Sequence, residues 1–187
     1  MPPINFGSNF LKTISIPHKS AENQYSNSDV AIVELDENDC NDTYAVGDAA
    51  IKWDNVGKSF GLDIYSEMLK PDIACDSKKE HYLAITEQES GYKYLNPNKI
   101  IALAMFSEKK GNTNKLNWLQ VNPSTNKENS QNRSFKHVGV SMLDFIKNNY
   151  SSKPIYVEST ENSASFYTKN KFEAIDKKHP YNLIWMG

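Results

Sequence analysis

An amphipathic helix pattern between two strand-like segments constrains the fold of this chain more than any other feature. In VGVSMLDFIKNNY (138–150) the apolar residues recur three and four positions apart, which predicts a helix with one apolar face. KLNWLQVNP (115–123) precedes this helix and PIYVES (154–159) follows it, and both are strand-like. A second short helix is expected at 160–170. Strands and helices that alternate in this way predict a mixed α/β domain.

The rest of the chain extends the same pattern. The fold class that we predict is α/β (α+β), a single domain with a mixed central sheet of about six to seven strands flanked by about four helices. Residues 29–187 form this domain, and the polar residues 1–28 form an N-terminal extension that drapes over it or frays. Further strands are expected at 29–36, 81–88, 99–108, 172–176 and 182–187, and one or two short helices with a flexible joint at 43–70.

Composition narrows the classes of function. The 187 residues suffice for one domain with a sizeable core. A net charge of -2 gives no overall electrostatic reason to bind nucleic acid or an anionic membrane. Cys40 and Cys75 form no CxxC unit, so a reduced cytosolic chain is the simplest interpretation, with one disulfide as the alternative. Because no run of about 18 apolar residues exists to cross a bilayer, we expect a soluble, cytoplasmic protein.

A polar loop at 124–137 leads directly into the predicted helix at 138–150. The first N–H groups of a helix lack partners within the helix and carry the positive end of its dipole, so a phosphate can bind there. Arg133, Lys136 and His137 would add donors just before the helix. An ordinary surface loop is the alternative.

Two aromatic residues lie on the predicted short helix at 160–170. Phe166 is expected to face the core, and Tyr167 then points about 100° away around the helix. A buried tyrosine normally finds a partner for its hydroxyl, and a positioned one can donate a proton to a thiolate leaving group. A tyrosine at the core boundary that binds only water is the alternative.

Together these patterns resemble the GNAT superfamily of acyl-CoA-dependent N-acyltransferases. The family's signature Gln/Arg-x-x-Gly-x-Gly/Ala corresponds to SFKHVG (134–139), which retains only the last glycine. A second signature, N-x-x-A-F-Y-x-K-x-G-F, resembles NSASFYTKNKF (162–172), where Lys171 replaces the glycine. We expect Asn170 to take the left-handed conformation at that helix end. NWLQVNPS is similar to the central strand of the family.

The resemblance implies a cofactor, acetyl-CoA, and a set of site residues. The backbone around the first signature would hold the pyrophosphate, the central strand would pair with the pantetheine arm, and Tyr167 would protonate the departing CoA sulfur. The predicted cofactor-binding residues are Leu119, Gln120, Val121, Arg133, Ser134, Lys136, His137, Val138, Gly139 and Asn162. For the base that takes a proton from the attacking amine we select Glu108, beside a predicted strand, with Glu87 and Glu89 as alternatives. For each of the three, a solvated charge at a strand end is the structural alternative.

The implied function is N-acetyltransferase activity, which transfers an acetyl group from acetyl-CoA to a primary amine by direct attack in a ternary complex. The alternatives are a GNAT-shaped binding module with a degenerate cofactor site, and a tRNA-directed toxin-like acetyltransferase. We expect a small-molecule or peptide amine acceptor and no membrane partner. Nucleic acid is a minor alternative, and a homodimer stays open. Because the four histidines show no zinc-type spacing, we expect no metal site.

Overall fold

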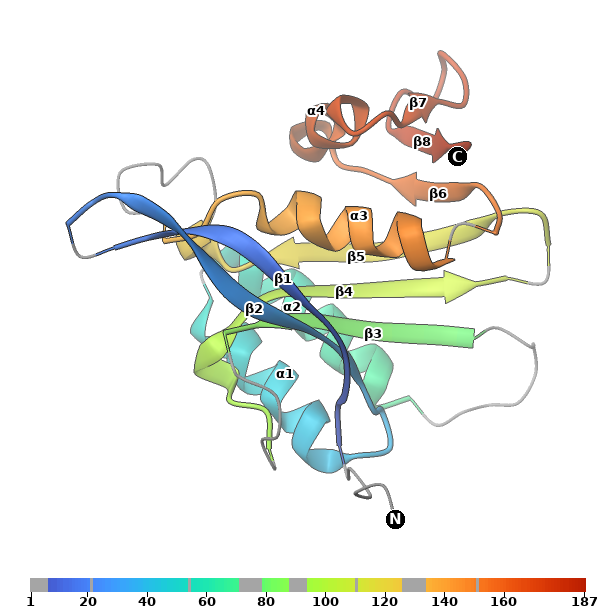
Figure 1. Cartoon of the computed structure of the whole chain (residues 1–187). Coiled ribbons are helices and arrows are strands. Elements are labelled where there is room, and N and C mark those ends of the chain that lie inside the picture. The colour runs from blue at the N-terminus through green and yellow to red at the C-terminus, as the bar shows by residue number, and fades with distance from the viewer. Residues whose placement is uncertain are drawn as a thin grey trace.

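The computed structural model of the chain contains one eight-stranded sheet with strand order β1-β2-β3-β4-β5-β6-β8-β7, and four α-helices among the residues that it describes (Figure 1). The described residues are 7–20, 22–53, 55–70, 79–87, 94–109, 111–125, 134–150 and 152–187, with 55–58 described in backbone only. The elements are β1 (Asn9–Lys19), β2 (Tyr25–Leu35), α1 (Cys40–Lys52), α2 (Asn55–Met68), β3 (Lys79–Thr86), η1 (Pro97–Lys99), β4 (Ile100–Glu108), β5 (Asn114–Val121), η2 (Pro123–Thr125), α3 (Val138–Tyr150), β6 (Ile155–Glu158), α4 (Glu161–Lys169), β7 (Glu173–Ala174) and β8 (Asn182–Trp185). The predicted α/β class is confirmed, and the sheet has eight strands rather than six to seven.

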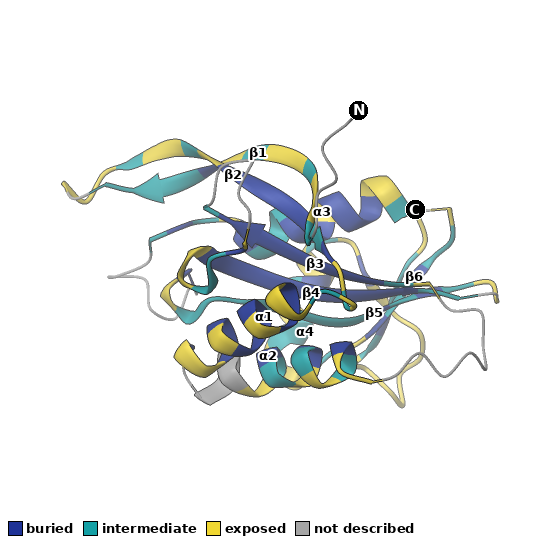
Figure 2. Cartoon of the chain, turned by 90° about the horizontal axis from the view of Figure 1, so that it is seen from below, coloured by how far each residue is buried: buried dark blue, intermediate teal, exposed yellow. Residues whose placement is uncertain are grey.

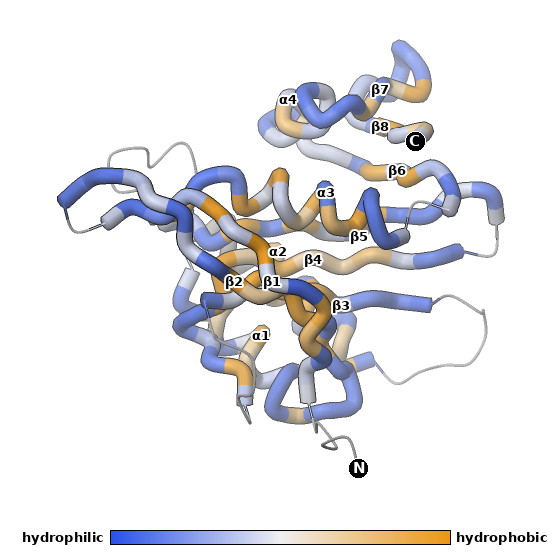
Figure 3. The backbone as a smooth tube through the Cα atoms, viewed as in Figure 1, coloured by the Kyte–Doolittle hydropathy of each residue, from blue (hydrophilic) through white to orange (hydrophobic). Residues whose placement is uncertain are grey.

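The additional strand is β1, which lies inside the segment that was expected to drape or fray. β1 pairs antiparallel with β2 along its whole length. β2 pairs with β3 only over 31–35, so 14–19 of β1 and 25–30 of β2 form a two-stranded arm beyond the rest of the sheet (Figure 1). We call these two segments the β1–β2 arm. Polar residues dominate the arm (Figure 3), which explains why sequence patterns did not reveal it.

Helices cover both faces of the central strands (Figures 1 and 2). On one face Val33, Ala84 and Leu103 belong to the apolar cluster that includes α1 and α2. On the other face the alternating residues of the same strands pack with α3, through side chains such as Met142 and Ile146. Because the inner parts of β3 and β4 are buried on both sides, 83–85 and 100–106 are apolar throughout (Figure 3).

The two helices on the first face pack closely because of a glycine. A Cβ atom on Gly61 would lie 2.6 Å from the Ala50 Cβ atom, a distance that only glycine avoids. α2 runs through Gly61 without interruption, so this glycine serves helix packing and not the flexible joint that was expected.

Candidate functional site

Strands β5 and β6 form a fork that is closed at one end and open at the other. The two strands are parallel, and they pair only where 114–116 lies beside 155–157. β6 then ends while β5 continues, so within the described part of the chain 117–121 has no partner strand on the β6 side. We call 114–116 the closed end of the fork and 117–121 its open end.

The open end presents backbone hydrogen-bonding groups away from β4. Just beyond it, Asn122 N–H donates to Ile101 O at 2.8 Å, and this bond fixes which residues face β4. Backbone groups alternate in direction along a strand, so the N–H and C=O groups of Gln120 point toward β4, whereas those of Leu119 and Val121 point away from it. Gln120 Nε2 donates to the Val121 carbonyl at 2.8 Å. Another extended chain could therefore pair with this edge of β5.

A β-bulge marks the point where β5 leaves β6. The residues on either side of Asn117 lie opposite consecutive residues of β4, so Asn117 is an extra residue in the strand. Its Nδ2 donates to Ser107 Oγ at 2.5 Å. Sequence analysis missed this residue. The sequence does contain a signal for the bulge: Trp118 and Leu119 are two consecutive apolar residues that interrupt the alternation of the strand.

The first turn of α3 lies against the open end. A Cβ atom on Gly139 would lie 3.4 Å from Val121 Cγ1 and 3.5 Å from the Phe166 ring. The end of β5, the start of α3 and the helix α4 therefore converge at Gly139. The structure thus brings together the strand, the helix start and the short helix that carried the resemblance.

Backbone N–H groups are left without acceptors at the start of α3. The first helical hydrogen bond is donated by Ser141, so the N–H groups of 137–140 have no acceptor among the described residues. By contrast, the N–H groups of Ser134 and Lys136 donate to carbonyl groups elsewhere in the protein, at 3.0 and 2.9 Å. The groups available to an anion are those of 137–140, at the positive end of the helix dipole.

The two positions at which a signature glycine is replaced both adopt the left-handed conformation. His137 has φ 62° and Lys171 has φ 66°. The expectation that Asn170 takes this conformation is wrong, because its φ is -97°. Asn170 instead caps α4, with Nδ2 donating to Phe166 O at 2.8 Å, and its carbonyl accepts from Lys147 Nζ at 2.6 Å. The chain reverses one residue later, at Lys171.

Tyr167 is 6% exposed and lies between two phenyl rings. The ring centroids of Phe166 and Phe172 are 5.0 and 5.5 Å from that of Tyr167, in edge-to-face geometry. In the part of the chain that the structure describes, its hydroxyl has no hydrogen-bond partner, and Ser20 Oγ is the only fully buried side-chain atom of that kind. The Tyr167 hydroxyl therefore still reaches solvent. Burial raises the pKa of Tyr167, so the phenol stays protonated.

Glu108 lies at a different place, on a buried histidine. His81 is 1% exposed, with Nδ1 2.5 Å from Glu34 Oε1 and Nε2 2.8 Å from Glu108 Oε1. The Tyr150 ring, at the C-terminal end of α3, lies 4.4 Å from the His81 ring. Because a helix of 13 residues is about 20 Å long, this cluster is remote from the start of α3. Glu108 is therefore not brought together with Tyr167.

The remaining predicted residues are dispersed or lie outside the described residues. Asn162 is exposed in the first turn of α4. Arg133, Glu89 and Cys75 lie outside the described residues, so the structure does not place them. Cys40 is an exposed free thiol.

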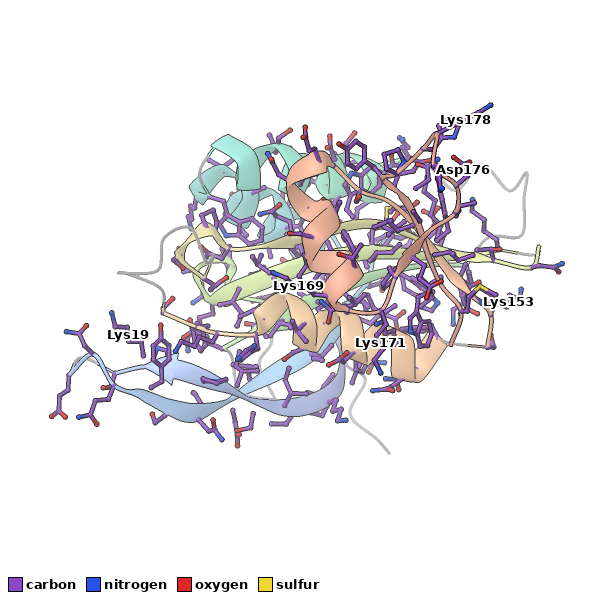
Figure 4. The ribbon with its side chains drawn as sticks, turned by 90° about the horizontal axis from the view of Figure 1, so that it is seen from above. Lys19, Lys153, Lys169, Lys171, Asp176 and Lys178 are labelled. Carbon is purple, nitrogen blue, oxygen red and sulfur yellow. The ribbon has the colours of Figure 1, made fainter. Side chains whose placement is uncertain are left out.

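Charge is distributed unevenly along the chain. Residues 1–108 contain 17 acidic and nine basic side chains, whereas 109–187 contain six acidic and 12 basic ones. Lysines of the second part surround α4 and the last strands (Figure 4). The near-neutral total of -2 therefore conceals an acidic part that includes α1 and α2, and a basic part that includes α3 and α4.

None of the described helices is both long and apolar enough to cross a membrane. No group of three or more His, Cys, Asp or Glu side chains that could hold a metal ion is found in the same part of the chain.

Comparison with known proteins gives matches in fold. No protein-family model matches the sequence, and no curated protein matches it either. A crystal structure from Desulfovibrio desulfuricans, described as an acetyltransferase of the GNAT family, is similar to this chain with a TM-score of 0.50 and 14% identity, over 83% of this chain and 96% of that one. A tyrosine-to-phenylalanine mutant of the AtaT toxin, bound to the C-terminus of the antitoxin AtaR and acetyl-CoA, is similar with a TM-score of 0.52 and 11% identity, over 85% and 94%.

Proposed function

We propose that this chain, whose fold is that of the GNAT acetyltransferases, transfers an acetyl group from acetyl-CoA to a primary amine by direct attack in a ternary complex. The observation that carries the proposal is the open end of the fork. There an unpaired strand edge, unpaired helix N–H groups and the protonated hydroxyl of Tyr167 belong to three elements that converge at Gly139.

The proposed cofactor contacts use helix N–H groups without an acceptor and a strand edge without a partner strand among the described residues. The N–H groups of 137–140 would bind the pyrophosphate. Leu119 and Val121 would pair with the amides of the pantetheine arm, as an added strand pairs with a sheet edge. Gln120 would support this edge by its bond to the Val121 carbonyl. Ser134, Lys136, Arg133 and Asn162 remain sequence-based proposals for this site.

The replaced glycine does not prevent this arrangement. The His137 side chain is exposed and its backbone already has the left-handed conformation. Val138 is buried and anchors the first turn of α3 in the core. The loop therefore has the backbone conformation that the signature glycine would adopt. The Cβ atom of His137 makes this conformation cost about 1–2 kcal/mol.

The transfer requires a nucleophile, an acyl donor and a proton for the leaving sulfur. Acetyl-CoA supplies the acyl group. The uncharged amine forms a C–N bond as the C–S bond breaks, the amine loses a proton to a base, and the sulfur gains one from Tyr167, which is then reprotonated from water. Because burial keeps Tyr167 protonated, it is a donor at every ordinary pH. The protein would otherwise contribute the positioning of the two substrates.

The proposal does not depend on which group is the base. Glu108, the candidate from the sequence, binds His81 at the closed end. A carboxylate can also take the amine proton through a water molecule, and the acidic part of the chain, residues 1–108, would favour a cationic acceptor that approaches from the α1–α2 side.

A thermal shift with acetyl-CoA tests the binding, and thiol release tests the reaction. Ligand at 100 times its dissociation constant should stabilise the fold by about 2.7 kcal/mol, which corresponds to a rise in Tm of roughly 5–10 °C for a chain of this size. CoA should give a similar shift. Thiol release should then appear with one member of a panel of small amines, amino acids and peptides. The absence of any shift at millimolar acetyl-CoA would favour the binding-module alternative.

A second candidate acceptor is an amine carried by RNA. The basic part of the chain, where Lys169, Lys171 and Lys178 lie around α4 and the last strands (Figure 4), is the observation that favours it. Aminoacyl-tRNA belongs in the acceptor panel for this reason. Thiol release with aminoacyl-tRNA should fall steeply as the salt concentration rises, whereas thiol release with free amines should not.

A further inference from the structure

The β1–β2 arm contacts the loop that leads into α3. Lys19 N–H donates to Ser134 O at 2.7 Å, and Lys136 N–H donates to Pro17 O at 2.9 Å. Between these two bonds the His18 ring stacks on the Phe135 ring, with centroids 4.4 Å apart and an interplanar angle of 25°. The arm therefore holds the loop as a short antiparallel strand would.

Side chains strengthen the same contact. Phe135 is 2% exposed and belongs to the core cluster of α3, together with Ile16 of the arm. Lys136 Nζ lies 3.6 Å from the centroid of the Tyr25 ring on the second strand of the arm, a cation–π contact. Both strands of the arm thus contact the loop.

The position of this contact matters because of the next residue. His137 directly follows Lys136 and is held in the left-handed conformation, which costs free energy for a residue with a Cβ atom. Such a conformation persists when surrounding contacts fix it. Among the described residues, Phe135 and Lys136 contact the arm on the preceding side of His137, and Ser134 bonds to Ser124 of η2.

We propose that His18 is a positioning residue for the cofactor site. Its ring clamps Phe135, so that the loop and the N–H groups of 137–140 are held in the geometry that binds an anion. His18 itself would not touch the cofactor. This inference rests on the proposed function, because it concerns the affinity of the same site for acetyl-CoA.

Docking of the β1–β2 arm on the loop and binding of acetyl-CoA should each favour the other. If an undocked arm leaves the loop competent for binding about one tenth of the time, the apparent dissociation constant rises about tenfold. By linkage, a cofactor that orders the loop also orders the arm. A two-stranded arm is only marginally stable by itself, so this ordering should be measurable along the arm.

The test is calorimetric titration of the full chain with acetyl-CoA, together with kinetics. His18→Ala should raise the dissociation constant and the KM for acetyl-CoA about tenfold, with kcat at saturation within twofold of wild type. His18→Phe keeps an aromatic ring at this position and should restore affinity to within twofold. Asn27→Ala is the matched control: Asn27 is exposed on the same arm, and its replacement should leave binding unchanged.

Hydrogen exchange provides a second measurement. Acetyl-CoA should slow exchange of the Lys19 N–H, which bonds to the loop, in wild type and in His18→Phe but not in His18→Ala. If wild type binds acetyl-CoA and His18→Ala binds it equally well, the positioning role is overturned while the proposed function stands. If wild type itself binds no acetyl-CoA, the proposed function has failed.

Discussion

The two ends of β5 differ in how their polar groups are satisfied. At the closed end, Asn114 is 1% exposed. Its N–H donates to Pro154 O at 2.8 Å, its Nδ2 donates to Tyr150 O at 3.1 Å, and its Oδ1 accepts from Lys109 N–H at 3.3 Å. At the open end, 117–121 is half-buried and lacks a partner strand on one side. One strand therefore combines a sealed segment with a segment that no described strand pairs on one side.

Because of this difference, stability and activity should depend on opposite ends of β5. Buried groups that bond to one another at the closed end stabilise the fold, and their loss leaves unsatisfied partners. Backbone groups on the β6 side of the open end have no partner strand to lose among the described residues. Substitutions at the closed end should therefore change the free energy of unfolding, and substitutions at the open end should change catalysis.

The largest effect is expected at the buried histidine near the closed end. His81→Ala removes the partner of both Glu34 and Glu108, so we expect a loss of about 3 kcal/mol in the free energy of unfolding. Urea denaturation measures this change. His179→Ala is the control, since that histidine is exposed, and it should leave the urea midpoint unchanged. An equally small effect of His81→Ala would remove the contrast between the two ends.

The next effect is expected at the open end. Tyr167→Phe should lower kcat about 100-fold while the dissociation constant for acetyl-CoA stays within twofold. The free energy of unfolding should hardly change, because the hydroxyl has no hydrogen-bond partner among the described residues. Steady-state kinetics and titration calorimetry give the two values. Equal losses of turnover and affinity would mean that Tyr167 only packs.

If Tyr167 protonates the leaving sulfur, the direction in which kcat changes with pH can be predicted. Burial raises the pKa of Tyr167, so its proton is present below the ordinary tyrosine pKa of about 10 and is lost only above it. The kcat of wild type should therefore rise as the acceptor amine deprotonates and should not decline below pH of about 10. A decline of kcat between pH 7 and 9 would argue against a tyrosine donor.

A smaller effect is expected for Glu108. Its replacement distinguishes a stabilising role at the closed end from a role as the catalytic base. Glu108→Gln retains a side-chain acceptor for His81 but loses the charge, so we expect a loss of about 1 kcal/mol in the free energy of unfolding. If Glu108 acts only at the closed end, kcat stays within about threefold of wild type. A 100-fold fall in kcat with unchanged stability would instead identify Glu108 as the base that the sequence suggested.

The smallest effect is expected where α4 ends. Lys171→Gly should raise the free energy of unfolding by about 1 kcal/mol, because glycine adopts the left-handed conformation without strain. Tm should then rise by roughly 2–4 °C. Lys169→Gly, at the last residue of α4 itself, should lower it instead. A fall in Tm for Lys171→Gly would show that its side chain matters more than its backbone.

Sequence patterns predicted the parts of the molecule that depend on local periodicity. The helix 138–150 was predicted with the bounds that the structure gives to α3, because its apolar face repeats at helical spacing. The strand at 115–123 was close to β5. Tyr167 was singled out from a short motif, and the structure places its neighbour Phe166 beside Gly139 at the open end; the role of Tyr167 stays a prediction.

Features that depend on distant contacts were not predictable. Glu34 and Glu108 are 47 and 27 residues from His81, so no local pattern relates them. The β1–β2 arm is polar and owes its position to contacts with Phe135, more than 100 residues away. Nor did the sequence show that Lys171 rather than Asn170 would adopt positive φ, or that the Asn170 carbonyl accepts a bond from Lys147, which is 23 residues away.

The most direct test of the central claim, that the open end of the fork holds acetyl-CoA, is an NMR titration of the backbone amides with this ligand. We predict the largest chemical-shift changes at Leu119, Val121 and 137–140, with little change at the closed end. A surface hollow of about 330 Å³ lies near the closed end, lined by Lys109, Lys115 and Tyr156 among others. Changes confined to that hollow, or none at millimolar acetyl-CoA, would contradict the account.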